Sequence, residues 1–150
     1  MNQAILGEML AQNKVSCSFA LDRVTEENAG WRLNEAAASV GFIYRHIGET
    51  MNLFGNFFGR QTDVQNTTMG AEDSGQHFAV AESRGLVERG YAMMEGLVAQ
   101  TPDDAWLDMV ETPFFGTVSR VRLFSHVLFH TAHHAGQIAL TLSRPRSQGR

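Results

Sequence analysis

The chain has almost no cysteine, and this absence restricts what it can be. Cys17 is the single cysteine among 150 residues, so no intrachain disulfide and no CxxC pair for zinc or redox chemistry can form. That predicts a reducing, cytoplasmic setting. The longest apolar run, around Val40 to Tyr44, is too short to span a bilayer. No signal peptide is expected either, because Glu8 interrupts the apolar N-terminus.

Basic residues are also in the minority. Lys and Arg together number 12 against 16 Asp and Glu, which gives a net charge of −4. Nucleic-acid binding needs a clustered basic surface, so no nucleic-acid partner is expected. The chain is 43% hydrophobic and 19% charged, an ordinary globular composition. A single domain over residues 1–150 can bury its own core without a metal, so any bound metal is expected to serve function.

Apolar residues recur at steps of three and four, the pattern of helices that face a core. The predicted helices cover residues 1–25, 35–58, 74–100 and about 117–143. The expected N-caps are polar side chains that accept a backbone N–H: Asn34, Ser74, and Thr117 or Ser119. Pro145 is expected to stop the last helix.

The connections between these helices are polar or irregular. Residues 59–74 show no apolar pattern and are predicted to form a loop. Alternation in residues 106–115 is too brief to predict a strand, and Pro113 and Gly116 favour turns. We therefore expect an all-α protein, a four-helix bundle of up-and-down or crossover topology.

Histidines cluster in the last predicted helix. Four of the six fall within residues 126–134, at His126, His130, His133 and His134. On a helix, residues four apart stand on the same face, and both His126 with His130 and His130 with His134 satisfy that spacing. Such a pair can converge on one ion at about 2.0–2.1 Å. Zinc is the first expectation, with nickel or iron as alternatives, because imidazole binds all of them.

A third ligand must come from another helix, and His46 fits that requirement. It lies among Ile43, Ile47 and Phe54, where a histidine has no packing advantage, and facing helices of a bundle can bring such side chains together. The triad His46, His130 and His134 would leave a coordination position open for water or substrate. Alternatives remain: His46 as a hydrogen-bonded core residue, the pair as a surface feature, or His133 in place of His134.

Several neighbouring residues are candidates for catalysis or support. Glu49, one turn from His46, could act as a general base, and His126 or His133 could move protons or simply face solvent. Gln137 could donate a hydrogen bond to a metal-bound ligand or be solvated. Gly136 costs roughly 1 kcal/mol in a helix, which suggests a close approach of another helix or a ligand. Aromatic residues could wall a pocket beside His46: Phe54, Phe57 and Phe58.

Two stretches resemble the DinB-like (DinB/YfiT) superfamily. The run from His126 to Ile138, HVLFHTAHHAGQI, is similar to its C-terminal signature. The stretch from Trp31 to Glu49, WRLNEAAASVGFIYRHIGE, resembles its second-helix motif. The resemblance extends over essentially the whole chain and includes the turn from Thr112 to Gly116. One departure is Ala135, where many members carry arginine, so an anion-binding or salt-bridge role of that arginine is not carried over.

The resemblance implies a four-helix bundle whose metal ligands are His46, His130 and His134, and it implies a homodimer. Characterised members include transferases and isomerases that depend on low-molecular-weight thiols such as mycothiol, bacillithiol or glutathione. The leading hypothesis is therefore a metal-dependent, thiol-dependent S-transferase, or a related isomerase or hydrolase, acting on small electrophiles. The alternatives are a non-enzymatic metal-binding or stress-response protein, and a bundle that binds no metal.

Overall fold

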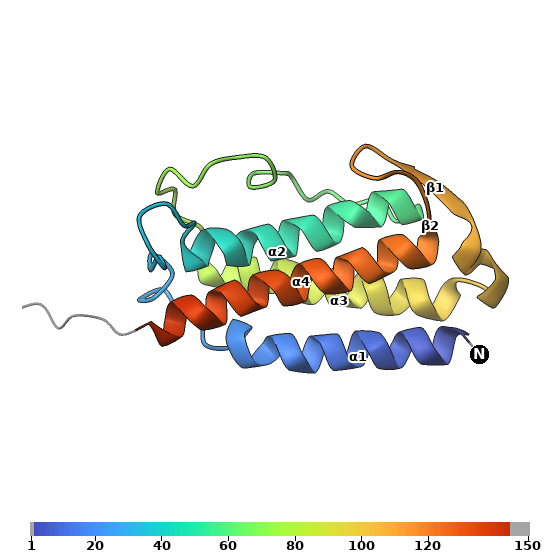
Figure 1. Cartoon of the computed structure of the whole chain (residues 1–150), viewed down its shortest axis with the longest axis horizontal. Coiled ribbons are helices and arrows are strands. Elements are labelled where there is room, and N and C mark those ends of the chain that lie inside the picture. Colours follow the sequence, from blue (N-terminus) through green and yellow to red (C-terminus); the bar gives the residue numbers. More distant parts are fainter. Residues whose placement is uncertain (1, 145–150) are drawn as a thin grey trace, which may run out of the picture.

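Four long helices lie side by side along the length of the molecule (Figure 1). The computed structural model describes residues 2–144. Its long helices are α1 (Asn2–Leu21), α2 (Val40–Phe54), α3 (Val80–Gln100) and α4 (Arg120–Ser143). Shorter elements connect them: the 3₁₀ helices η1 (Gly55–Phe58) and η2 (Asp103–Leu107), and the strands β1 (Met109–Thr112) and β2 (Gly116–Ser119). The predicted all-α, four-helix-bundle class is confirmed.

The topology is the crossover form. In Figure 1, α2 and α3 run in the same direction. Residues 59–79, which connect the end of the η1 turn to the start of α3, run back along the outside of the bundle. Helices α1 and α4 form the other parallel pair, and α2 packs against both α3 and α4. This arrangement places α2 beside α4, the two helices that carry the predicted metal ligands. Within the described residues, no helix is long and apolar enough to cross a membrane.

Helix α2 begins later than the expected residue 35. Ser39, not Asn34, is its N-cap, and the Ser39 hydroxyl accepts the Phe42 backbone N–H at 3.3 Å. Asn34 caps only an isolated turn, because its Oδ1 accepts from Ala36 and Ala37. The predicted end near Phe58 is confirmed, since η1 continues the helical path to that residue. Asn34 and Ser39 are both residue types that suit an N-cap. Ser39 is favoured by a tertiary contact, because its backbone N–H donates to the Asp73 carboxylate.

The third helix was expected to begin at Ser74 and instead begins at Val80. Gly75 has φ +88°, a left-handed conformation that a helix cannot contain, so Ser74 lies in the loop. The first helix likewise ends at Leu21 rather than near residue 25. The fourth helix has the expected cap at Ser119 and ends at Ser143, while Pro145 lies outside the described residues.

A short hairpin stands where no strand was predicted. Strands β1 and β2 pair antiparallel, with Val110 opposite Val118. The expected turn is present, and Gly116 supplies its positive φ of 64°. Strands of four residues leave almost no periodic signal in the sequence. In addition, most of β2 lies in the stretch that was predicted to belong to the last helix.

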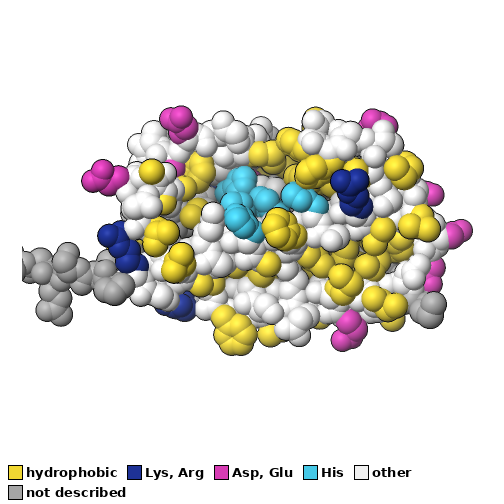
Figure 2. Space-filling view, viewed as in Figure 1, with side chains coloured by type: hydrophobic (Ala, Val, Ile, Leu, Met, Phe, Trp, Pro, Cys, Tyr) yellow, Lys and Arg dark blue, Asp and Glu magenta, His cyan; other side chains and the backbone are white. Residues whose placement is uncertain are grey.

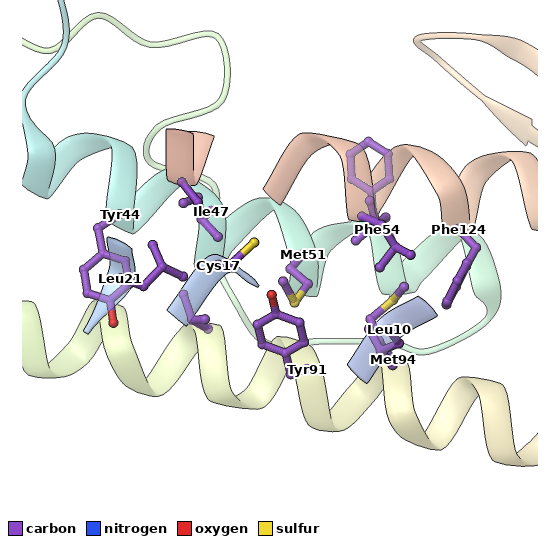
Figure 3. Close-up of a cluster of buried hydrophobic side chains, with 14 of the residues drawn as sticks. Leu10, Cys17, Leu21, Tyr44, Ile47, Met51, Phe54, Tyr91, Met94 and Phe124 are labelled. Atoms are coloured by element: carbon purple, nitrogen blue, oxygen red, sulfur yellow. The ribbon is translucent and has the colours of Figure 1, made fainter. Parts of the chain in front are cut away.

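The core fills the space between the four helices, and Figure 3 shows side chains from all of them meeting there. Buried residues include Leu10 from α1, Ile47 from α2, Met94 from α3 and Phe124 from α4. Helices α2 and α3 approach most closely at glycines. A Cβ on Gly48 would lie 2.7 Å from Leu86 Cβ, and one on Gly90 would lie 2.5 Å from Met51 Sδ.

Candidate metal centre

Helix α4 presents a row of histidines along one face. Its Ser119 cap accepts the Arg122 backbone N–H, and successive residues then turn by about 100°. His126, His130 and His134 are therefore aligned, whereas His133 points away and is exposed. Figure 2 shows the histidine side chains gathered in a shallow hollow on the face of the molecule that α4 forms.

Helix α2 brings His46 to the same place. Gly48 faces α3 at close range, and a residue two positions earlier lies about 200° around the helix, so His46 faces α4. His46 Nε2 lies 3.0 Å from His130 Nε2. The ring centroids of His46 and His134 are 4.8 Å apart, and those of His130 and His134 are 4.4 Å apart. The structure thus brings together the three histidines that were predicted as ligands.

These nitrogens have the spacing that one ion requires. Two imidazole nitrogens, each about 2.0–2.1 Å from a zinc ion, lie roughly 2.9–3.4 Å apart for ligand angles near 90–110°. The 3.0 Å between the Nε2 atoms of His46 and His130 falls in that range. The ligand atoms of His46, His130 and His134 all lie within 4.8 Å of one another, so the three side chains are close enough to share one ion.

Burial keeps these imidazoles uncharged. It lowers the pKa of His46 to about 4, with His134 adding to the effect and Glu49 opposing it. Burial, with the neighbouring histidines, lowers the pKa of His130 to about 2. Burial also lowers the pKa of His134, against the hydrogen bond that its ring donates to Gln137, which raises it. Neutral imidazole is the form that binds metals, so the side chains are already in that form near neutral pH.

A hydrogen-bonded network supports His46 from behind. His46 Nδ1 lies 3.2 Å from the Thr68 hydroxyl, which donates to Glu49 Oε2 at 2.8 Å. Glu49 is fully buried and also accepts from the side chains of Thr67 and Arg45, at 2.6 and 2.7 Å. The backbone N–H groups of Thr67 and Thr68 donate to it as well.

Glu49 is therefore placed differently from a general base. Burial raises its pKa, but the hydrogen bonds from Thr67, Arg45 and Thr68 together outweigh that effect and lower it. Its oxygens are already occupied by these donors, and it does not line the pocket described below. The structure puts this carboxylate behind His46, on the side away from the open part of the site.

His134 has a simpler support. Its Nδ1 lies 2.6 Å from Gln137 Oε1, and a carbonyl oxygen can only accept, so His134 Nδ1 carries the hydrogen. Gln137 was predicted either to donate to a metal-bound ligand or to be solvated, and the structure shows an exposed side chain whose oxygen accepts from the His134 ring. Gln137 is exposed, so this support stands at the surface of the molecule.

A pocket of about 300 Å³ opens beside His46 and His134. Its walls are mainly apolar and are formed by Leu33, Ala37, Ala38, Phe42, Ile43 and Leu140, with Thr68, Gln137 and Thr141 as further polar groups. Among residues 2–144, no charged side chain lines it. The expectation that Phe54, Phe57 and Phe58 wall this pocket is wrong. Phe54 and Phe57 instead contact Phe114 of the hairpin loop, and Phe58 is buried in the core.

The remaining predicted residues stay outside the triad. His126 stacks on Phe54 at 5.5 Å and meets Phe115 edge-on at 4.6 Å, and burial lowers its pKa. His133 stacks on Phe129 at the surface. A Cβ on Gly136 would meet nothing within 4 Å, so the expected close approach of another helix is wrong, whereas the alternative of a ligand stays a prediction. Ala135, in place of the family's arginine, is packed in the core.

The sequence gives no sign of the threonines that donate to Glu49. Thr67 and Thr68 lie in the long loop without an apolar pattern, and they meet Glu49 only through the tertiary fold. The one local signal was Glu49 itself, a carboxylate in an apolar helical stretch. A buried carboxylate requires several donors, and the helix alone could not supply them.

Comparisons with known proteins agree with this architecture. The sequence model of a family described as the DinB superfamily matches residues 14–138. A conserved protein from Enterococcus faecalis has a similar structure, with TM-score 0.67 and 13% identity over 94% of this chain and 97% of that chain. A solved four-helix bundle protein has TM-score 0.64 and 18% identity over 94% and 99%. No curated protein sequence matches the chain.

Proposed function

The chain belongs to the DinB superfamily, and from that premise we propose that it binds one divalent metal ion through His46, His130 and His134 to act on a small molecule. The observation that carries the proposal is the convergence of these three histidines beside an open pocket. Zn²⁺ is the first expectation, with Ni²⁺ or Fe²⁺ as alternatives. A divalent ion there would supply Lewis acidity and lower the pKa of a coordinated thiol or water.

The pocket favours an uncharged, mainly apolar substrate. Leu33, Phe42 and Leu140 line it, and no charged side chain does. Among the apolar side chains, away from the proposed ion, a carboxylate or phosphate would lose its hydration without gaining a counter-charge from the protein, which is costly. A volume of about 300 Å³ is at the small end of ligand sites. The exposed polar group in the lining that could orient such a molecule is the Gln137 amide.

The reaction class that we favour is transfer of a small electrophile onto a low-molecular-weight thiol. It rests on the family resemblance and on a pocket that suits an apolar electrophile. The test measures thiol consumption against a panel of small electrophiles, with protein stripped of metal and protein reloaded with Zn²⁺. We expect turnover only in the loaded form. Equal rates in the two forms would eliminate the role of the metal.

A second candidate is a metal-binding protein without catalytic activity, such as a stress-response protein. It is favoured by the absence of any carboxylate from the pocket lining, which leaves no acidic general base there. This candidate predicts a higher melting temperature on metal addition and no turnover with any electrophile. Calorimetric melting of stripped and reloaded protein, run beside the thiol assay, separates the two candidates.

We also propose that two copies of the chain associate. The exposed large hydrophobic side chains of the described residues lie on α1, η2, the hairpin and α4, and none lies on α2 or α3. Helix α1 carries one acid, Glu8, and one base, Lys14, so two such faces can meet without strong repulsion. Light scattering should give the mass of a dimer, and Phe19→Asp, at a side chain 76% exposed, should shift it toward the monomer.

A further inference from the structure

We propose that Glu49, acting through the Thr68 hydroxyl, holds His46 in the tautomer that directs an Nε2 lone pair toward His130 and the metal. The inference deepens the proposed metal-binding function and rests on it. Neither Glu49 nor Thr68 is a metal ligand in this proposal. Both are positioning residues, and the chain of contacts runs from a buried carboxylate through a hydroxyl to one imidazole nitrogen.

The direction of each hydrogen bond follows from counting hydrogens. Glu49 accepts two backbone N–H groups, the Arg45 Nε–H and the Thr67 hydroxyl, so it is an ionised carboxylate that carries no hydrogen of its own. The Thr68 hydroxyl, 2.8 Å from Glu49 Oε2, must therefore donate its single hydrogen to Glu49. A hydroxyl has one hydrogen and two lone pairs, so only a lone pair remains for His46.

His46 Nδ1 lies 3.2 Å from that oxygen and must be the donor. A neutral imidazole carries one N–H, so a hydrogen on Nδ1 leaves Nε2 bare. That bare nitrogen faces His130 Nε2 at 3.0 Å. The same reasoning applied to His134, whose Nδ1 donates to Gln137 Oε1, leaves its Nε2 bare as well. Partners that orient a ligating histidine in this way commonly contribute 10- to 100-fold in metal affinity.

A purely structural reading would assign Glu49 to anchoring the loop on α2. Two threonines allow the two readings to be separated. The Thr67 and Thr68 hydroxyls both donate to Glu49, and both loop N–H groups do so too. Of the two hydroxyls, Thr68 alone has a hydrogen bond to His46. Valine has nearly the shape of threonine, so Thr68→Val and Thr67→Val are a matched pair.

The experiment measures two quantities on wild type, Thr68→Val, Thr67→Val and Thr68→Ser. The first is the His46 tautomer in metal-free protein, from the ¹⁵N resonances of its ring. The second is the Zn²⁺ dissociation constant, from competition with a chelator. We expect wild type to carry hydrogen on Nδ1. Thr68→Val should lose that preference and bind Zn²⁺ about 10- to 100-fold more weakly. Thr68→Ser should restore both, and Thr67→Val should stay close to wild type.

Several outcomes would overturn the inference. If the hydrogen of metal-free wild type lies on His46 Nε2, the inference is overturned even if no variant folds. Equal losses of affinity in Thr67→Val and Thr68→Val would leave loop anchoring as the explanation. Failure of the proposed function looks different: wild type would bind no Zn²⁺, while the tautomer measurement would still decide whether Glu49 and Thr68 orient His46.

Discussion

The two helices that flank the histidine site are built in opposite ways. Helix α2 is closely packed: Gly48 and Gly90 let it approach α3, and His46 is supported by a hydroxyl and a fully buried carboxylate. Helix α4 is more loosely packed. Gly136, about 200° around the helix from His134, meets nothing within 4 Å, and His134 is supported by one exposed amide, Gln137.

This difference assigns the two helices different tasks. A ligand held by a packed helix and a buried network is fixed before any metal arrives, which lowers the entropy that binding must overcome. A histidine whose ring is held by an exposed amide is freer to adjust when an ion or a substrate enters. The pocket lies on the side of His46 and His134, so the adjustable ligand also faces the space where a substrate would bind.

Loss of a histidine should give the largest effect. Because orienting partners alone are worth about 10- to 100-fold, removing the ligand in His46→Ala should weaken Zn²⁺ binding by about 100-fold or more. His130→Ala, whose ring is central to the group, should do the same. His134→Ala should cost less, since it removes the adjustable ligand. Elemental analysis of untagged protein and chelator competition measure these changes.

His133→Ala is the control for these variants. It removes an exposed histidine next to His134 and should leave metal content unchanged. Full metal content in the double variant of His46→Ala with His130→Ala would refute the triad. Greater sensitivity to His134→Ala than to His46→Ala would reverse the assignment of fixed and adjustable ligands.

Acid should destabilise the metal-free protein through the buried histidines. The pKa of His46 falls from its ordinary 6.5 to about 4 on folding, so the unfolded chain binds more protons between these values. The free energy of unfolding should therefore not depend on this group above about pH 6.5 and should decrease as the pH falls from 6.5 toward 4. Urea unfolding at several pH values should show this slope, and His46→Ala should reduce it. A flat profile from pH 7 to pH 4 would show that His46 is not buried as neutral imidazole.

The sequence predicted the histidine cluster better than it predicted the residues that support it. His130 and His134 share one helix, so spacing alone puts them on one face. His46 could be proposed because a histidine among apolar residues needs an explanation. Thr68 could not be found in this way, because its position against Glu49 depends on how residues 59–79 fold back along the bundle. Helix boundaries failed for a similar reason, since Ser39 and Gly75 act through tertiary contacts and backbone conformation.

Adding a side chain where α2 contacts α3 should destabilise the protein. A methyl group added by Gly48→Ala would lie 2.7 Å from Leu86 Cβ, so the helices must separate. Overpacking of this kind typically costs about 1–3 kcal/mol. Urea unfolding should show that loss, and Zn²⁺ affinity should fall with it because His46 moves with α2. Unchanged affinity in a destabilised variant would separate the packing of α2 from the placement of its ligand.

The smallest expected effect is a gain in stability, and it tests the loose packing of α4. Gly136→Ala adds a methyl group where nothing lies within 4 Å, inside the helical span of α4. Alanine is favoured over glycine in a helix by about 0.5–1 kcal/mol because it restricts the unfolded chain. We therefore expect a small stabilisation in urea unfolding, with Zn²⁺ affinity unchanged. A destabilisation instead would mean that another molecule packs against this face in solution, and its dependence on protein concentration would identify a second copy as that molecule.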